Sequence, residues 1–382
     1  MGCPAMEKKR MINEIFALRS IACLCIVFLH SIEIALRSSY LQGMGTVMVM
    51  IFDSIQVFLY FGTPVFIFIS ELIIAYSYRN RAIPENFLNK RFKFIFIPFI
   101  FMAFFYSLPY AVSFTDWGTK FLLNVFIGDY HGYFVLIIFQ FYLLHLFLHK
   151  YLQQANPRTM ILLSFGINIA YLALFNLTAS PFSNPVMMYL WDRFYWIPFF
   201  GWIFYFTLGY YCGYYYEEFK QWVVKNRVPI IIAPVVSTFL LLFFYHNDML
   251  LVHSSKRVDI LLHTVAIIFI IMYLGQKLKV VPPFLVSISQ YSFGIYLIHV
   301  FYLHAVDTLV RLSGLSFGTS YIFILFLISV FASIYTIKLA NRWKFGQFIV
   351  GKLGVGAKGK DSDESGPGQN SSSSENGLRP KT

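Results

Sequence analysis

Three residues that could carry acid–base and anion-binding chemistry, Arg19, His30 and Glu33, fall within one apolar stretch of the chain. An imidazole exchanges protons near neutral pH, a carboxylate can orient it, and a guanidinium binds anions. Arg19 and His30 are eleven residues apart, nearly three helical turns. A helix would therefore present both on one face, roughly 16 Å apart along its axis. Glu33 lies three residues beyond His30 on the same side. The spacing predicts a polar line along one helix.

This line is informative because the chain is otherwise strongly apolar. Of 382 residues, 58 % are hydrophobic and only 13 % are charged, which excludes an ordinary soluble domain and a disordered chain. A charge in the middle of a membrane is costly and usually faces a cavity or a partner. The alternative is structural: Arg19 would extend towards the membrane surface, and His30 would form one hydrogen bond to a neighbouring helix.

The chain contains ten apolar stretches that approach the roughly 20 residues needed to cross a membrane. They cover about 12–36, 55–78, 92–114, 133–149, 160–176, 195–216, 228–245, 260–274, 284–308 and 319–340. We therefore expect an all-α, polytopic integral membrane protein with about ten transmembrane helices. Residues 1–350 form its membrane domain. Residues 351–382, which include four consecutive serines, are expected to form a disordered tail.

The basic residues predict how the chain is oriented. The net charge is +12, and the Lys and Arg residues cluster between the apolar stretches, as in a membrane protein rather than a nucleic-acid-binding one. If the amino terminus is inside, 23 of the 30 lie on the inner side and Arg19 alone lies within a span. The six on the outer side are Arg37, Lys120, Arg193, Lys256, Arg257 and Arg311. This bias predicts that both termini are cytoplasmic. The expected location is a cell membrane, namely a bacterial plasma membrane.

Other polar residues are candidates for a site. Tyr296 and His299 lie within the ninth stretch, and Asp129, His131 and Tyr133 lie in the loop before the fourth. Aromatic rings beside Asp and His can stack on sugars, although Tyr and Trp near a membrane surface are also common as interfacial residues. The four cysteines match neither a disulfide framework nor a zinc site, and no metal is expected.

The order of these features resembles the membrane acyltransferase family 3 over about residues 12–345. Besides Arg19 and His30, the similar segments are 61–70 (FGTPVFIFIS), 90–99 (KRFKFIFIPF) and 292–299 (SFGIYLIH). Within the family, segments 132–141 and 200–209 resemble the intercellular adhesion protein C branch. That branch is linked to poly-β-1,6-N-acetylglucosamine, and has been described both as its exporter and as an O-succinyl transferase. The chain departs from the family pattern at Glu71, where glycine is frequent, and at Phe94, where a second arginine is frequent.

The resemblance implies an O-acyltransferase that moves an acetyl or succinyl group from cytoplasmic acyl-CoA to a polysaccharide hydroxyl. Acyl-CoA would be a co-substrate, with no permanently bound cofactor. His30 would act as general base with Glu33 orienting it. The expected donor-binding residues are Arg19, Ser70, Arg91 and Lys93, and the acceptor or pathway candidates are Asp129, His131, Tyr133, Tyr296 and His299. The expected partners are membrane lipid, a polysaccharide acceptor and a glycan synthase complex, with no nucleic acid.

Two other function classes fit the same residues. A polysaccharide exporter or proton-coupled transporter would use Arg19, His30 and Glu33 to line a path. The other class is a non-catalytic membrane scaffold, which would leave these costly charges without a use. The location of the polymer in a strain lacking the protein separates the first two classes, because polymer outside the cell indicates an enzyme and polymer inside indicates an exporter.

Overall fold

The computed structural model describes residues 13–38, 45–250 and 252–353. These residues form helices joined by turns and contain no β-strand. Within this part of the chain, nine helical segments are long and apolar enough to cross a membrane. The predicted all-α, multi-pass membrane architecture is confirmed, while the cytoplasmic placement of both termini stays a prediction.

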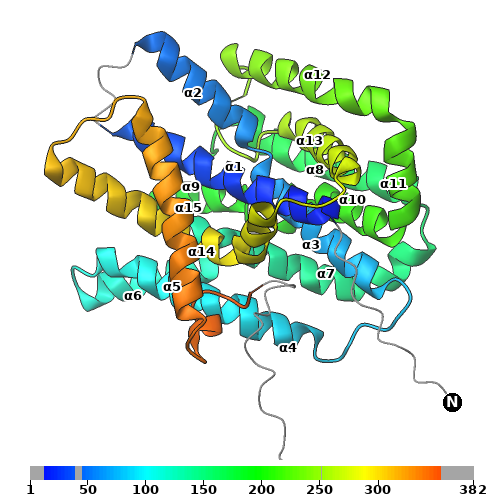
Figure 1. Ribbon diagram of the computed structural model, residues 1–382, viewed down its shortest axis with the longest axis horizontal. Coiled ribbons are helices and arrows are strands. Elements are labelled where there is room, and N and C mark those ends of the chain that lie inside the picture. The colour runs from blue at the N-terminus through cyan, green and yellow to red at the C-terminus, as the bar shows by residue number, and fades with distance from the viewer. Residues whose placement is uncertain (1–12, 39–44, 251, 354–382) are drawn as a thin grey trace, which may run out of the picture.

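Helix α1 (Asn13–Arg37), which carries the predicted polar line, lies in the middle of the bundle (Figure 1). It packs against five other helices: α2 (Thr46–Leu59), α3 (Gly62–Tyr78), α13 (Ile260–Lys277), α14 (Pro283–Ser313) and α15 (Ser320–Ala340). Apolar residues on several of its faces are buried, among them Leu18, Ala22 and Ile32. Most of α1 is therefore enclosed by other helices, while Arg37 at its end is exposed.

The second apolar stretch is divided into two helices and begins earlier than predicted. Helix α2 ends at Leu59, and α3 starts at Gly62 after a turn at Tyr60 and Phe61. Pro64 stands in the first turn of α3, where its missing N–H costs little, but there it leaves the carbonyl of Tyr60 without a helical partner. A proline at this position therefore favours a helix start.

The third stretch is also irregular. Helix α4 (Phe87–Arg91) continues into a π-helical turn over Phe92–Phe96, and α5 (Ile97–Ser107) follows. The amide of Ile97 bonds to the carbonyl of Phe92, five residues back. Pro98 follows directly. Its ring cannot donate and would crowd the carbonyl four residues before it, which the wider turn avoids. The π turn changes the directions of the side chains that precede α5.

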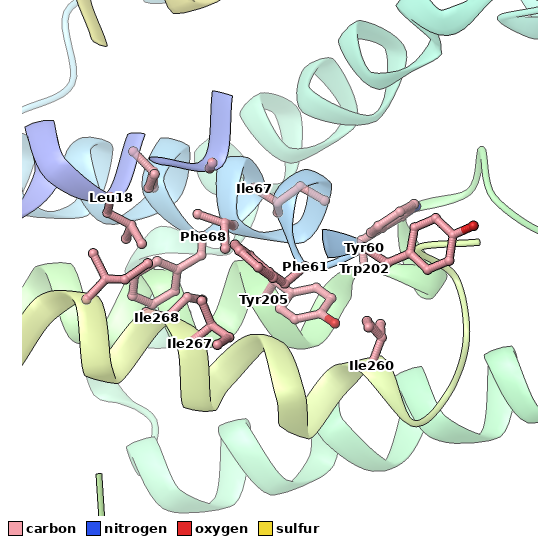
Figure 2. Close-up of a cluster of buried hydrophobic side chains, with 14 of the residues drawn as sticks. Leu18, Tyr60, Phe61, Ile67, Phe68, Trp202, Tyr205, Ile260, Ile267 and Ile268 are labelled. Atoms are coloured by element: carbon pink, nitrogen blue, oxygen red, sulfur yellow. The ribbon is translucent and has the colours of Figure 1, made fainter. Parts of the chain in front are cut away.

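The sixth predicted stretch, 195–216, differs most from expectation. It forms the 12-residue helix α10 (Ile203–Tyr214), which is shorter than the roughly 20 residues of a full span. Nearly all of α10 is buried, and a Cβ added at Gly213 would lie 2.3 Å from the carbonyl oxygen of Leu72 on α3. Gly209 makes a similarly close approach, so the Gly-x-x-x-Gly spacing lets two backbones touch. Figure 2 shows Tyr205 beside Phe61 and Trp202 beside Tyr60 in this core.

The remaining helices complete the bundle. They are α6 (Phe114–Leu122), α7 (Phe134–Gln154), α8 (Pro157–Leu177), α9 (Pro185–Phe194), α11 (Tyr216–Lys225) and α12 (Arg227–His246). In Figure 1, α2 and α12 lie along one side of the molecule, and α4, α5 and α6 lie along the opposite side. The described chain ends at Leu353, so residues 354–382 of the predicted tail lie outside the described residues.

Candidate active site

A cavity of about 980 Å³ lies beside α1 and brings together side chains from distant parts of the sequence. One end, which we call the α4 end, is lined by Lys90, Arg91, Phe94 and Lys352. The other end, which we call the α2 end, is lined by Asp53, Gln56, His253 and Lys256. Three of the four α4-end residues are cationic, whereas the α2 end has mixed charge.

Arg19 and His30 both line this cavity, so the two residues predicted to share a face of α1 face the same space. Within the described chain, no hydrogen bond or ion pair to the Arg19 guanidinium is present. An unpaired cation inside a helical bundle is costly and is favoured where an anion can reach it. The position therefore suits a residue that attracts a negatively charged group.

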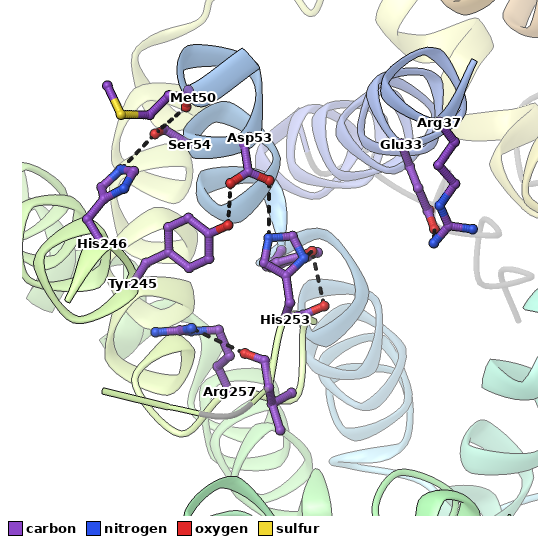
Figure 3. Close-up of polar contacts among 11 residues, drawn as sticks. Glu33, Arg37, Met50, Asp53, Ser54, Tyr245, His246, His253 and Arg257 are labelled. Atoms are coloured by element: carbon purple, nitrogen blue, oxygen red, sulfur yellow. Dashed lines mark hydrogen bonds and ion pairs between the residues drawn. The ribbon is translucent and has the colours of Figure 1, made fainter. Parts of the chain in front are cut away.

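The imidazole of His30 is held by a carboxylate on its own helix. Nδ1 of His30 lies 2.9 Å from Oε2 of Glu33, and the other carboxylate oxygen lies 2.8 Å from the guanidinium of Arg37. Figure 3 shows the Glu33–Arg37 pair at the end of α1. The tautomer that donates from Nδ1 to Glu33 leaves the Nε2 lone pair free to accept a proton. This arrangement is that of an oriented general base.

Two further histidines continue from His30 in a row of ring contacts. The rings of His30 and His299 are 5.5 Å apart, and those of His299 and His131 are also 5.5 Å apart. His131 lines the cavity, and its backbone carbonyl accepts a hydrogen bond of 2.5 Å from the Tyr296 hydroxyl. His299 is fully buried behind His30 and does not line the cavity.

The protonation of His299 follows from its contacts. Its Nδ1 lies 3.0 and 2.9 Å from the carbonyl oxygens of Ile295 and Tyr296, so Nδ1 carries the hydrogen. Its Nε2 is buried and has no hydrogen-bond partner among the described residues. His299 therefore presents a neutral ring to His30, and its placement is that of a packing and positioning residue.

The predicted donor-binding residues fall into two groups. Ser70 and Arg91 line the cavity, and the Arg91 guanidinium lies 3.5 Å from the centre of the Phe87 ring. Lys93, in contrast, does not line the cavity and extends over the rings of Phe94 and Phe348. Lys93 belongs to the π-helical turn, whose side-chain directions differ from those of a regular helix. Lys90 and Lys352 line the α4 end in its place.

The two acidic and aromatic candidates of the loop before α7 have different roles. Asp129 does not line the cavity. It lies 2.6 Å from the ammonium of Lys120 and also accepts from Arg193, which ties together the segments around α6 and α9. Tyr133 does line the cavity, and its ring stacks on Trp196 with centroids 5.6 Å apart. Of these two residues, only Tyr133 is therefore positioned to touch a bound molecule.

Sequence reasoning missed a polar group at the α2 end, which Figure 3 shows. The hydroxyl of Tyr60 lies 2.8 Å from Nδ1 of His253, and Nε2 of the same ring lies 3.3 Å from Asp53. The hydroxyl of Tyr245 donates to the other oxygen of Asp53. Tyr60, Asp53 and His253 all line the cavity. The signal in the sequence is the run His253-Ser254-Ser255-Lys256-Arg257, which is polar between two apolar stretches.

The family departure at Glu71 has a structural counterpart away from the cavity. Oε1 of Glu71 lies 2.6 Å from Nδ1 of His145, and the two side chains are 2 % and 1 % exposed. The pair joins α3 to α7 inside the bundle. In the described part of the chain, no group of three or more His, Cys, Asp and Glu residues is arranged to hold a metal ion.

Comparison with known proteins agrees with this architecture. Residues 12–338 match the profile of the family described as "Acyltransferase domain". The chain is 36 % identical over 351 residues, covering 90 % of this chain and 95 % of the relative, to the "Putative membrane-bound acyltransferase YfiQ" of Bacillus subtilis (strain 168).

More distant relatives carry a different name. Over 299 residues, 77 % of this chain and 82 % of the relative, the chain is 30 % identical to a "Probable poly-beta-1,6-N-acetyl-D-glucosamine export protein" of Staphylococcus aureus (strain Mu50 / ATCC 700699). A protein of the same name in Staphylococcus epidermidis is 27 % identical over 302 residues, 77 % of this chain and 81 % of the relative. No solved structure gives a significant match.

The profile spans most of the chain, including the helix with Arg19 and His30 and the helices that line the cavity. The resemblance predicted from the sequence segments is confirmed. The chain belongs to this acyltransferase family and is a multi-pass membrane acyltransferase.

Proposed function

We propose that the protein is an O-acyltransferase that moves a short acyl group, acetyl or succinyl, from acyl-CoA to a hydroxyl of a polysaccharide. The observation that carries the proposal is the His30–Glu33 pair, because His30 lines a cavity with a cationic end and an end of mixed charge. One end suits a phosphorylated donor and the other suits a hydroxyl-rich acceptor.

The donor would enter at the α4 end, from the cytoplasm. Lys90, Arg91 and Lys352 would bind its phosphates, since several cations around one space suit a multiply charged group. Arg19 lies on α1 and has no partner in the described chain. It would draw the thioester end of the donor inwards. Ser70 lines the same space.

The acceptor hydroxyl would enter from the α2 end. Nε2 of His30 takes the proton of the hydroxyl as its oxygen attacks the thioester carbonyl. The tetrahedral intermediate then collapses, the carbon–sulfur bond breaks, and the thiolate receives the proton from His30. Glu33 stabilises the imidazolium that exists between these steps. The products are an O-acylated sugar and CoA.

The poly-N-acetylglucosamine named in the more distant relatives supports a polysaccharide acceptor. The direct test uses the full chain in liposomes with labelled acetyl-CoA, succinyl-CoA and an oligomer of β-1,6-linked N-acetylglucosamine. Mass spectrometry of the oligomer should show one added acyl group per modified hydroxyl. His30→Gln should reduce this product about 10²–10⁴-fold, the usual contribution of a general base. Unchanged product with His30→Gln would overturn the mechanism.

Export without acyl transfer is the second candidate, and the names of the relatives favour it. In cells that lack the protein, acyl transfer predicts unmodified polymer at the surface, whereas export predicts polymer retained inside. Expressing the His30→Gln variant in these cells further separates acyl transfer from export. An acyltransferase variant would leave polymer outside but unmodified.

A further inference from the structure

A buried lysine that no proposed step uses lies at the α2 end of the cavity. Lys256 is 7 % exposed, lines the cavity, and belongs to the loop between α12 and α13. Asn176, at the end of α8, fixes this loop with both side-chain atoms. Its Nδ2 donates to the carbonyl of Lys256 at 3.1 Å, and its Oδ1 accepts from the amide of Val258 at 2.9 Å. The fully buried side chain of Asn176 therefore holds the backbone at Lys256 in place.

The ammonium of Lys256 is surrounded by aromatic rings. Nζ lies 4.3 Å from the centre of the Trp196 ring and 4.8 Å from the centre of the Tyr133 ring. Aromatic faces attract a cation, but they do not neutralise it. Within residues that the structure describes, no hydrogen bond or ion pair to Nζ is present.

Three carboxylates of the neighbouring segments are bound to other groups. Asp129 binds Lys120 and Arg193, Asp259 binds Arg257, and Asp53 binds His253 and Tyr245. Two hydroxyl-bearing residues, Ser254 and Ser255, line the cavity together with Lys256. The site thus offers one unpaired cation and adjacent hydroxyl donors to whatever enters the cavity. A buried charge of this kind is favoured by a ligand that brings the opposite charge.

We infer that Lys256 binds a carboxylate of the substrate. This inference rests on the proposed acyl transfer. The carboxylate belongs either to an acidic sugar of the acceptor or to the far end of a dicarboxylic acyl group. A single ammonium suits a single negative charge, whereas the phosphates of a donor match the group of cations at the opposite, α4 end. Lys256 would therefore determine which substrate is accepted, and its side chain does not take part in the chemical step.

The test measures binding to the full chain in detergent micelles by titration calorimetry, with two matched pairs of ligands. The donor arm compares succinyl-CoA with acetyl-CoA. The acceptor arm compares a disaccharide of N-acetylglucosamine and glucuronate with the same disaccharide containing glucose. We expect one arm to show at least tenfold tighter binding of the carboxylate member, and that arm identifies the source of the carboxylate.

The variants show whether Lys256 causes this preference. Lys256→Met should reduce it to less than twofold, and Lys256→Arg should retain it. Lys279→Met is the matched control, because Lys279 is exposed and lies away from the cavity. The inference is overturned if neither arm shows a preference in the unmodified protein, or if the preference survives in Lys256→Met.

A measurement without substitutions guards against a misfolded variant. The unmodified protein is treated with an acetylating reagent for amines, and modification of Lys256 is followed by peptide mass spectrometry. The carboxylate ligand should slow acetylation of Lys256 at least tenfold and leave Lys279 unaffected, while the neutral ligand should slow neither. Equal protection by both ligands would contradict the inference. Carboxylate-specific binding without any acylated glycan would instead contradict the proposed function alone.

Discussion

Glu33 holds His30 from within a single helical turn, with Oε2 of the carboxylate 2.9 Å from Nδ1 of the imidazole. The second oxygen of the carboxylate binds Arg37, so Glu33 is fixed on both sides. Because all three side chains leave one helix, their geometry depends little on how the other helices pack. The orientation of the proposed base is therefore a local property of α1.

This relationship predicts that substitutions at His30 and Glu33 have coupled effects on the rate of acyl transfer. His30→Gln should lower the rate of acyl transfer about 10²–10⁴-fold, since an amide cannot accept the proton. Glu33→Gln should lower it by a smaller factor, because the ring loses its oriented tautomer but keeps its nitrogen. In the His30→Gln background, Glu33→Gln should have no further effect. His246→Gln is the control, because His246 is exposed at the end of α12. Independent, multiplicative losses in the double variant would argue against a shared role.

The α4 end predicts how the donor is recognised. Lys352→Met should raise the KM for acyl-CoA about tenfold or more, as expected for a lost charge-assisted contact, with a smaller change in kcat. An acyl-pantetheine donor, which has no phosphates, should be affected less than twofold. Lys344→Met, an exposed change in the same terminal segment, serves as the control. A similar rise in KM with both donors would show that Lys352 does not act by binding the phosphates.

The buried pair Glu71–His145 predicts a stability effect without a direct effect on binding. Replacing either partner alone leaves an unpaired polar or charged group inside the bundle, which costs about 3–5 kcal/mol. A Glu71→Met and His145→Phe double replacement should cost less than the sum of the single changes. The surface pair Glu217–Lys220 is the control, and breaking it should cost under about 1 kcal/mol. Unfolding of the detergent-solubilised protein measures all four variants, and additive losses at positions 71 and 145 would be the contrary result.

The contact between α3 and α10 predicts a contrast between two glycines. Gly213→Ala should lower the melting temperature markedly, because its Cβ would lie 2.3 Å from the carbonyl oxygen of Leu72, where only backbone can move. Gly166→Ala, in α8, meets no atom within 4 Å and should be neutral or stabilise the helix by up to about 1 kcal/mol. Equal melting temperatures for the two variants would show that the close approach of α10 is not required.

What could be predicted from the sequence depended on whether a feature was local. The placement of Arg19, His30 and Glu33 follows from the period of one helix, and all three line the cavity. The length and apolar character of most spans are local in the same way. Helix α10 was assigned a full span because its flanking aromatic residues are as apolar as a membrane helix, whereas 195–202 forms turns.

The residues that could not be predicted meet through packing of distant segments. Tyr60, His253 and Asp53 come from two loops and a helix, and no spacing in the chain indicates their contacts. In the sequence Lys256 is one cation of a polar loop, and nothing in its spacing indicates that Trp196 and Tyr133 lie beside it. Lys93 shows the opposite case, since a π-helical turn before Pro98 takes a predicted cavity residue away from the cavity.

The continuity of α1 has a consequence for which donors can react. Arg19 and His30 belong to one unbroken helix, so their backbone positions are fixed roughly 16 Å apart along its axis. A rigid helix of this kind restricts the length of donor that can reach His30. A donor held by its phosphates at the α4 end must extend past Arg19, so one whose thioester lies too close to its phosphates would leave the carbonyl short of His30. Selection by length would thus operate alongside selection by charge.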